Sequence, residues 1–239
     1  MMMNEHTAKA FDLDLQELTR MVAEMGGLAE KQTADAVDAL ARRDADRAQR
    51  VVAADPAIDS LQREIEEKAV LTIARRQPMA VDLREIVGAL RVANDLERIG
   101  DLAKNIGKRV LALDGEFHPP KLIRGVEHIG ALVLAQLKQV LDSYTAHELE
   151  KALAVWNGDE EIDAMCTSLF RELLTYMMED PRNITFCIHL MFSAKNVERM
   201  GDHATNIAET VYYMIEGRAI ADERPKSDTT TFAALIPGN

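Results

Sequence analysis

The chain has 239 residues, and 40 acidic against 28 basic side chains give it a formal charge of −12. This excess of acid argues against a general nucleic-acid binder, which would present positive charge to phosphates, and two cysteines are too few for a disulfide framework. The first residues show no secretory signal and no stretch is apolar enough to span a membrane, so we expect a cytoplasmic protein.

Helices are expected in the first half of the chain, because apolar residues recur there at spacings of three and four. Such stripes cover residues 11–28, 61–73 and 83–110. Gln77-Pro78 ends the second helix, since the residue before a proline disfavours the α region. Asp55-Pro56 has the form of a helix start, with an aspartate cap and a proline in the first turn, so the second helix is either continuous or broken there.

The second half of the chain shows the same signals. It follows the clearest break, at 114–120, and contains further expected breaks at 157–159 and at Asp180-Pro181. Strand signals are nearly absent, because no segment alternates apolar and polar residues over several positions. The helical pattern fades after Gly217, and residues 218–239 are expected to form a disordered tail.

The two halves repeat each other in order and in spacing. The matched segments are 55–59 with 159–163, 77–78 with 180–181, 97–101 with 198–202, and 105–106 with 206–207. The offset between them drifts only from 104 to 101 residues, so we interpret the chain as a tandem duplication. We therefore expect an all-α protein of two antiparallel three-helix bundles, over residues 5–114 and 115–217, because short connections join antiparallel neighbours.

Acidic residues occupy corresponding positions in the two repeats. They are Asp55, Asp59, Glu97 and Asp101 in the first repeat and Asp159, Asp163, Glu198 and Asp202 in the second. Residues four apart share one helix face, and the helices on either side of each proline turn are antiparallel. Positions whose numbers have the same sum then lie level, so 55 should lie opposite 101 and 59 opposite 97, with the second repeat arranged in the same way.

Four carboxylates at one level would either take up protons or hold a cation. An all-oxygen set suits Mg, Ca, Mn or Fe ions and also admits Zn, so the sequence predicts a metal site in each repeat. Plainer explanations stay open, because solvated helix faces are often acidic and Asp55 and Asp159 have the form of N-caps. Arg98 and Arg199 are also close enough in sequence to neutralise the motifs.

Other residues carry weaker signals. Gly100 and Gly201 lie inside expected helices, where glycine costs ~1 kcal/mol relative to alanine, and we interpret them as positions of close packing. His203 is a less favoured metal ligand, because no Glu-x-x-His pair of a di-iron bundle accompanies it. Cys166 and Cys187 are expected to be small buried apolar residues, and no catalytic nucleophile is apparent.

These motifs resemble those of the PhoU family. The resemblance rests on the segments 75–78, 82–84 and 96–101 of the first repeat and 179–184 and 194–209 of the second. It implies two three-helix bundles in a cytoplasmic, usually homodimeric regulator that damps phosphate uptake and the phosphate-starvation response and is no enzyme. The implied partners are the ATPase of the phosphate ABC transporter and a phosphate-sensing histidine kinase, and the membrane is reached only through them.

Metal binding is also part of this resemblance, because members of the family bind iron, zinc or other metals through Glu/Asp-xxx-Asp motifs. The matching positions here are Glu97, Asp101, Glu198 and Asp202, and less closely Asp55, Asp59, Asp159 and Asp163. Lys195 replaces the Asn94 of the first repeat, so the second site is expected to be less negative. Two other functions stay open: a metal-dependent helical enzyme of the di-metal carboxylate type, and a structural adaptor that binds no metal.

Overall fold

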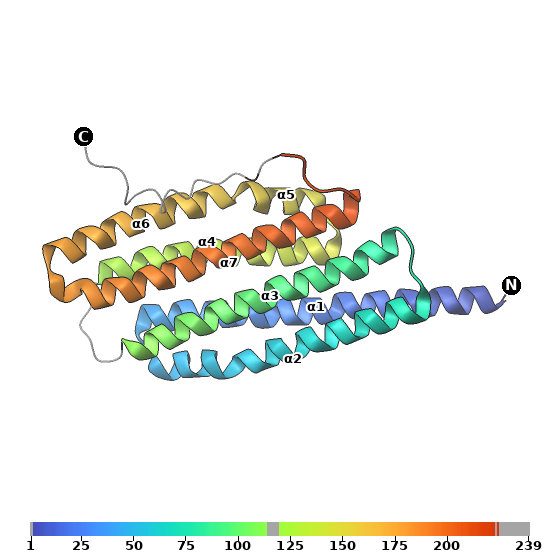
Figure 1. Cartoon of the computed structure of the whole chain (residues 1–239), viewed down its shortest axis with the longest axis horizontal. Helices are drawn as coiled ribbons and strands as arrows, with labels where there is room; N and C mark the ends of the chain where they lie inside the picture. The colour runs from blue at the N-terminus through green and yellow to red at the C-terminus, as the bar shows by residue number, and fades with distance from the viewer. Residues whose placement is uncertain (1, 114–119, 223, 225–239) are drawn as a thin grey trace.

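The computed structural model describes residues 2–113, 120–222 and 224, and over these residues it is helical without strands. The first repeat consists of α1 (Met2–Arg42), α2 (Ala45–Arg76) and α3 (Val81–Ala112). The second repeat consists of α4 (Pro120–Ala146), α5 (Leu149–Asn157), α6 (Asp159–Glu179), the short 3-10 helix η1 (Pro181–Asn183) and α7 (Ile184–Glu216). The long helices lie side by side along the longest axis of the molecule (Figure 1), and this confirms the predicted all-α fold of two tandem three-helix bundles.

The middle helix is broken in the second repeat but not in the first. Gly158 separates α5 from α6, at the break expected from the sequence. The alternative break at Asp55-Pro56 is wrong, because α2 runs through Pro56 and begins at its cap Asp44, whose side chain accepts a hydrogen bond from the Arg47 amide at 2.8 Å. Asp55 is therefore a buried residue inside a helix and not an N-cap.

Packing against α3 explains why α2 stays helical before its proline. A Cβ atom at Gly107 of α3 would lie 3.0 Å from the backbone oxygen of Ala48 and 3.4 Å from a methyl group of Val51. Both of these α2 residues are buried. Proline removes one helical hydrogen bond and strains the preceding turn, and the close contact between α2 and α3 offsets that cost.

The two repeats pack on each other through symmetry-related contacts of α1 and α4. A Cβ atom at Gly26 of α1 would lie 2.6 Å from the side chain of Leu141 in α4, and one at Gly130 of α4 would lie 2.9 Å from Val37 in α1. Gly26 and Gly130 are 104 positions apart, as are Val37 and Leu141. Exchanging the two repeats therefore converts each of these contacts into the other, as in the isologous interface of a two-fold dimer. The α3 and α7 helices of the two repeats also pack on each other.

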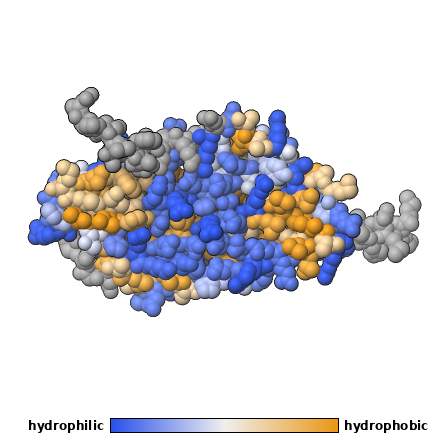
Figure 2. Space-filling view, viewed as in Figure 1, coloured by the Kyte–Doolittle hydropathy of each residue, from blue (hydrophilic) through white to orange (hydrophobic). Residues whose placement is uncertain are grey.

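Exposed apolar side chains flank the turns that join α2 to α3 and α6 to α7. They include Val70, Leu71, Met79, Val81 and Leu83 around the first turn and Leu174, Met178, Ile184, Ile188 and Phe192 around the second. These turns lie at opposite ends of the molecule in Figure 1, and Figure 2 shows apolar patches at both ends of this face with a hydrophilic band between them. None of the helices within the described residues is long and apolar enough to cross a membrane.

Candidate functional site

The first carboxylate cluster lies between α2 and α3 and is bridged by a lysine. Lys104 Nζ lies 2.6 Å from Asp55 Oδ2 and 2.5 Å from Asp101 Oδ1. Positions 55 and 101 therefore lie opposite each other, as the numbering of the hairpin predicted. Burial lowers the pKa of the Lys104 amine, whereas the hydrogen bonds and charges of Asp101 and Asp55 raise it. The pKa is raised overall, so the pairing outweighs the burial.

Glu97 and Asp59 belong to the same cluster. Burial raises the pKa of Glu97, the neighbouring Arg98 lowers it, and the charges of Asp101 and Asp59 raise it again. Arg98 is half-exposed and lies 3.4 Å from Glu97 and 3.8 Å from Asp101. The expected neutralisation by this arginine is therefore present but loose, and Lys104 is the closer counter-ion.

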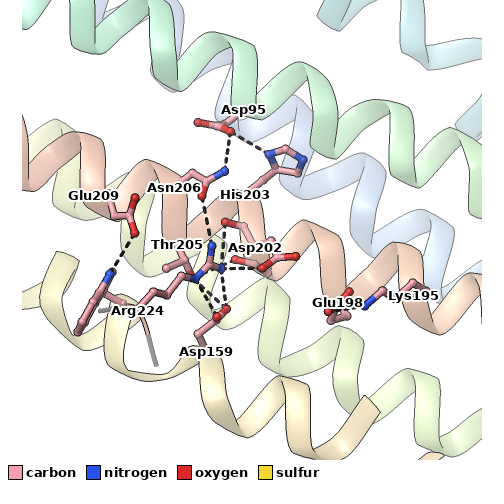
Figure 3. Close-up of polar contacts among 12 residues, drawn as sticks. Asp95, Asp159, Lys195, Glu198, Asp202, His203, Thr205, Asn206, Glu209 and Arg224 are labelled. Carbon is pink, nitrogen blue, oxygen red and sulfur yellow. Dashed lines mark hydrogen bonds and ion pairs between the residues drawn. The ribbon is translucent and has the colours of Figure 1, made fainter. Parts of the chain in front are cut away.

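The second cluster lies between α6 and α7 and is bridged by an arginine from beyond the repeat (Figure 3). The Arg224 guanidinium donates to both carboxylate oxygens of Asp159, at 2.9 and 3.0 Å, and to Asp202 Oδ1 at 2.8 Å. Thr205 donates a further hydrogen bond to Asp159, at 3.1 Å. Positions 159 and 202 thus lie opposite each other as predicted.

Arg224 lies in the segment 218–239 that we expected to be disordered. Residues 218–222 and Arg224 are described by the structure, and the remainder of that segment lies outside the described residues. The Arg224 side chain is only 16% exposed. This residue is therefore held against α6 and α7 by its ion pairs.

Glu198 is the most buried member of the two motifs that follow the proline turns. Its side chain is 5% exposed and accepts a hydrogen bond from Lys195 at 2.8 Å through Oε1, whereas its buried Oε2 has no hydrogen-bond partner among the described residues. Burial raises the pKa of Glu198, Lys195 lowers it, and the charges of Asp202 and Asp163 raise it. The lysine that distinguishes this repeat therefore offsets part of its negative charge, as expected.

Two glycines allow the paired helices to pack closely at the level of the carboxylates. A Cβ atom at Gly100 would lie 2.9 Å from Ile58 Cδ1, and one at Gly201 would lie 3.2 Å from Ile162 Cδ1. Each isoleucine sits inside the aspartate motif of the neighbouring helix, between positions 55 and 59 or 159 and 163. The prediction that these glycines serve close packing is confirmed.

His203 lies at the interface between the repeats and not on the carboxylates of its own helix pair. Its Nδ1 atom is 2.8 Å from Asp95 Oδ1 of α3, which also accepts from Asn206 at 3.4 Å (Figure 3). The less favoured assignment of His203 as a metal ligand is thus not supported by its placement. Cys166 and Cys187 are buried, as expected.

The donor chemistry of the two clusters fits a hard cation, although side-chain cations now bridge them. Within the part of the chain that the structure describes, no group of three or more His, Cys, Asp and Glu side chains is arranged to hold a metal ion. Lys104 and Arg224 lie between the facing aspartates, and Oε2 of Glu198 is a buried oxygen without a hydrogen-bond partner among the described residues. Metal binding would therefore require Lys104 or Arg224 to move.

Removing the buried charge of Glu198 should stabilise the metal-free protein at neutral pH. A carboxyl whose folded pKa is raised binds its proton more tightly in the folded state, so the stability that it costs grows as pH rises above its ordinary pKa of 4.5. We expect Glu198→Gln to raise the melting temperature at pH 7 by about 2–4 °C, the shift that 1 kcal/mol produces at this chain length.

The gain in melting temperature should shrink toward pH 4, where the wild-type Glu198 carboxyl is protonated and therefore uncharged, as the glutamine is at every pH. Thermal unfolding between pH 4 and 8 in the presence of a chelator measures it. The exposed Glu66→Gln substitution is the control and should change little. A Glu198→Gln protein that melts at or below the wild-type temperature at pH 7 would contradict this account of the buried carboxylate.

Comparison with known proteins decides the family. The model of the PhoU domain matches this chain twice, over residues 22–110 and 126–211. The chain belongs to the PhoU family. The two matches fall on the two structural repeats, and both contain the carboxylate motifs that follow the proline turns.

Curated relatives in the PhoU family align with nearly the whole chain. A phosphate-specific transport system accessory protein PhoU homolog of Rhizobium meliloti is 59% identical over 230 residues, which cover 96% of this chain and 97% of the relative. A homolog with the same description from Caulobacter vibrioides is 54% identical over 226 residues, which cover 95% and 98%.

Solved structures of family members share the fold. The crystal structure of PhoU from Pseudomonas aeruginosa superimposes with a TM-score of 0.82 at 39% identity, over 87% of this chain and all of that one. The phosphate transport system regulatory protein PhoU from Streptococcus pneumoniae gives a TM-score of 0.81 at 29% identity, over 88% of this chain and 99% of that one.

Proposed function

We propose that this protein is a non-enzymatic cytoplasmic regulator that lowers phosphate uptake through the phosphate ABC transporter and represses the phosphate-starvation response. The observation that carries the proposal is the alignment of the chain, almost end to end, with accessory proteins of phosphate-specific transport. The Streptococcus pneumoniae neighbour, which is described as a regulatory protein of phosphate transport, supports the same direction.

The proposed partners are the ATPase of that transporter and a phosphate-sensing histidine kinase. We propose that the protein acts as a homodimer and reaches the membrane only through these partners. The apolar side chains around the α2–α3 and α6–α7 turns support an interaction protein, because contiguous exposed apolar surface is typical of binding faces. Nucleic acid is not proposed as a partner, since the chain carries a formal charge of −12.

The two carboxylate clusters are the proposed metal sites, with iron or zinc as the first candidates and magnesium, manganese and calcium as alternatives. Asp55, Asp59, Glu97 and Asp101 would hold the ion of the first repeat, and Asp159, Asp163, Glu198 and Asp202 that of the second. A bound cation would take over the balancing of these carboxylates from Lys104 or Arg224 and would tie the paired helices together. It would also be required for any direct contact with phosphate, since carboxylates and phosphate repel each other.

A metal-dependent oxidase is the second candidate function, and the sequence argues against it. Di-iron bundles combine their glutamates with Glu-x-x-His pairs on facing helices, and no such pair occurs in this chain. His203, the histidine adjacent to Asp202, contacts Asp95 of the other repeat. We therefore assign the carboxylates a structural or sensory role.

Deletion of the gene tests the proposed function. We expect the deletion strain, grown with ample phosphate, to take up more phosphate and to express its phosphate-starvation genes. Raised uptake reports on the transporter and raised expression on the kinase, so the two readouts separate the proposed partners. A plasmid-borne copy of the gene should return phosphate uptake and gene expression to the wild-type levels. Normal uptake and normal repression in the deletion strain would refute the proposal.

A further inference from the structure

The Arg224 guanidinium contacts acceptors on three residues, although Arg224 lies beyond the last helix. Besides the oxygens of Asp159 and Asp202, its guanidinium contacts the Asp202 backbone oxygen at 3.4 Å and Asn206 Oδ1 at 3.3 Å. The side-on contact through Nε and one terminal nitrogen with both oxygens of Asp159 is the bidentate geometry of strong arginine–carboxylate pairs. Figure 3 shows these acceptors gathered around the guanidinium.

The comparison of the two repeats shows why an outside cation is needed. Lys104 bridges the facing aspartates of the first repeat, and the equivalent position of the second repeat, 101 residues later, is Thr205. A hydroxyl donates a hydrogen bond to Asp159 but carries no charge. Arg224 supplies the missing positive charge at the same level.

The surroundings of Asp159 favour a cation at this point. Its side chain is 3% exposed, and a buried carboxylate without a counter-charge is costly. Burial works to lower the pKa of Arg224, and the pairing with Asp159, Asp202 and Glu209 outweighs it, so the pKa is raised. A divalent cation at this position would carry twice the charge of the guanidinium and would attract both aspartates more strongly.

We propose that Arg224 is a tethered cation that competes with a divalent metal ion for the carboxylates of the second repeat. The proposal rests on the metal sites of the proposed function. A metal ion bound between Asp159 and Asp202 would take the place of the guanidinium and release the segment that carries it from α6 and α7. The second repeat thereby couples metal occupancy to the position of residues 218–222 and Arg224, while the first repeat, whose lysine belongs to α3, has no such coupling.

Release of this segment would uncover a defined part of α7. Residues 219, 220 and 222 cover one side of a groove of about 540 Å³ whose other wall includes Arg91 and Tyr213. A neighbouring hollow brings Arg218 and Ile220 beside Trp156. Trp156 is the only tryptophan of the chain and is 6% exposed, so its fluorescence is sensitive to the loss of Arg218 and Ile220 from this hollow.

The test measures zinc binding by calorimetry in the full-length, chelator-treated protein, in a Glu97→Gln/Asp101→Asn background that silences the first site. We expect Arg224→Gln in this background to bind Zn²⁺ at least about tenfold more tightly than the background alone, a difference of about 1.4 kcal/mol. Arg218→Gln is the matched control, because this arginine of the same segment is exposed and touches neither aspartate. Its zinc affinity should stay unchanged.

Trp156 emission gives the second readout. Saturating Zn²⁺ should shift the emission of the background protein to longer wavelength, and Arg224→Gln should show this shift before metal is added. Equal zinc affinities of the background protein and its Arg224→Gln variant, with unchanged emission, would overturn the competition but not the proposed metal sites. Tighter binding without an emission change would overturn the release of the segment. Absence of zinc binding in every variant would overturn both the competition and the metal assignment of the second repeat.

Discussion

Replacing Ile58 by alanine should lower the free energy of unfolding by about 3 kcal/mol. Ile58 is 2% exposed, and its Cδ1 atom lies against Gly100 of α3, so truncation leaves a cavity between α2 and α3 at the level of the first carboxylate cluster. The α2 and α3 helices cannot move together to close this cavity fully, because they are already in close contact elsewhere, as at Gly107 and Ala48. Chemical denaturation monitored by circular dichroism measures the loss.

Val70→Ala on the same helix is the control for this substitution. Val70 is 63% exposed, so removing its methyl groups should change the stability by no more than about 0.5 kcal/mol. Equal effects of the two substitutions would contradict the placement of Ile58 at the centre of the α2–α3 contact.

Filling the same contact from the opposite side should be nearly as costly. Gly100→Val is expected to lower the free energy of unfolding by about 2–3 kcal/mol, since an added Cβ atom would lie 2.9 Å from Ile58 and 3.2 Å from Gln32 Oε1. Gly27→Val is the matched control, because Gly27 is an exposed helical residue and no atom lies within 4 Å of a Cβ added there. The control should be neutral or slightly stabilising, as valine favours helix more than glycine does.

The double variant Ile58→Ala/Gly100→Val tests whether the two residues occupy one shared space. The valine methyl groups should fill part of the cavity left by Ile58, so the double variant should be more stable than the sum of the single effects by about 1 kcal/mol or more. Denaturation curves of the four proteins give this coupling directly. Strict additivity would show that the two side chains do not meet.

The position of the carboxylates was predictable because it follows from local rules. The proline turns fix the start of each returning helix, and the helical repeat of 3.6 residues then determines which positions lie level. Asp55 with Asp101, and Asp159 with Asp202, accordingly share a bridging side chain. The continuity of α2 was not predictable in this way, because contacts with α3 decide it against the local preference at Pro56.

Of the two side chains that bridge the facing aspartates, one could have been predicted from the sequence and the other could not. Lys104 follows Asp101 by one helical turn, a spacing that favours an ion pair, so its role could have been found in the sequence. Arg224 lies outside both repeats and carries no spacing signal. The contact of His203 with Asp95 depends on how the two bundles pack together, which helical periodicity within one repeat does not specify.

We propose that the acidic residues repeated in both halves hold metal ions, and the metal content of the protein tests this proposal most directly. Protein purified without a histidine tag, loaded with iron or zinc and passed through a desalting column should retain bound metal by elemental analysis. The Glu97→Ala/Asp101→Ala variant should retain less, because half of the ligands of the first site are removed. Equal and negligible metal in both proteins would contradict the account.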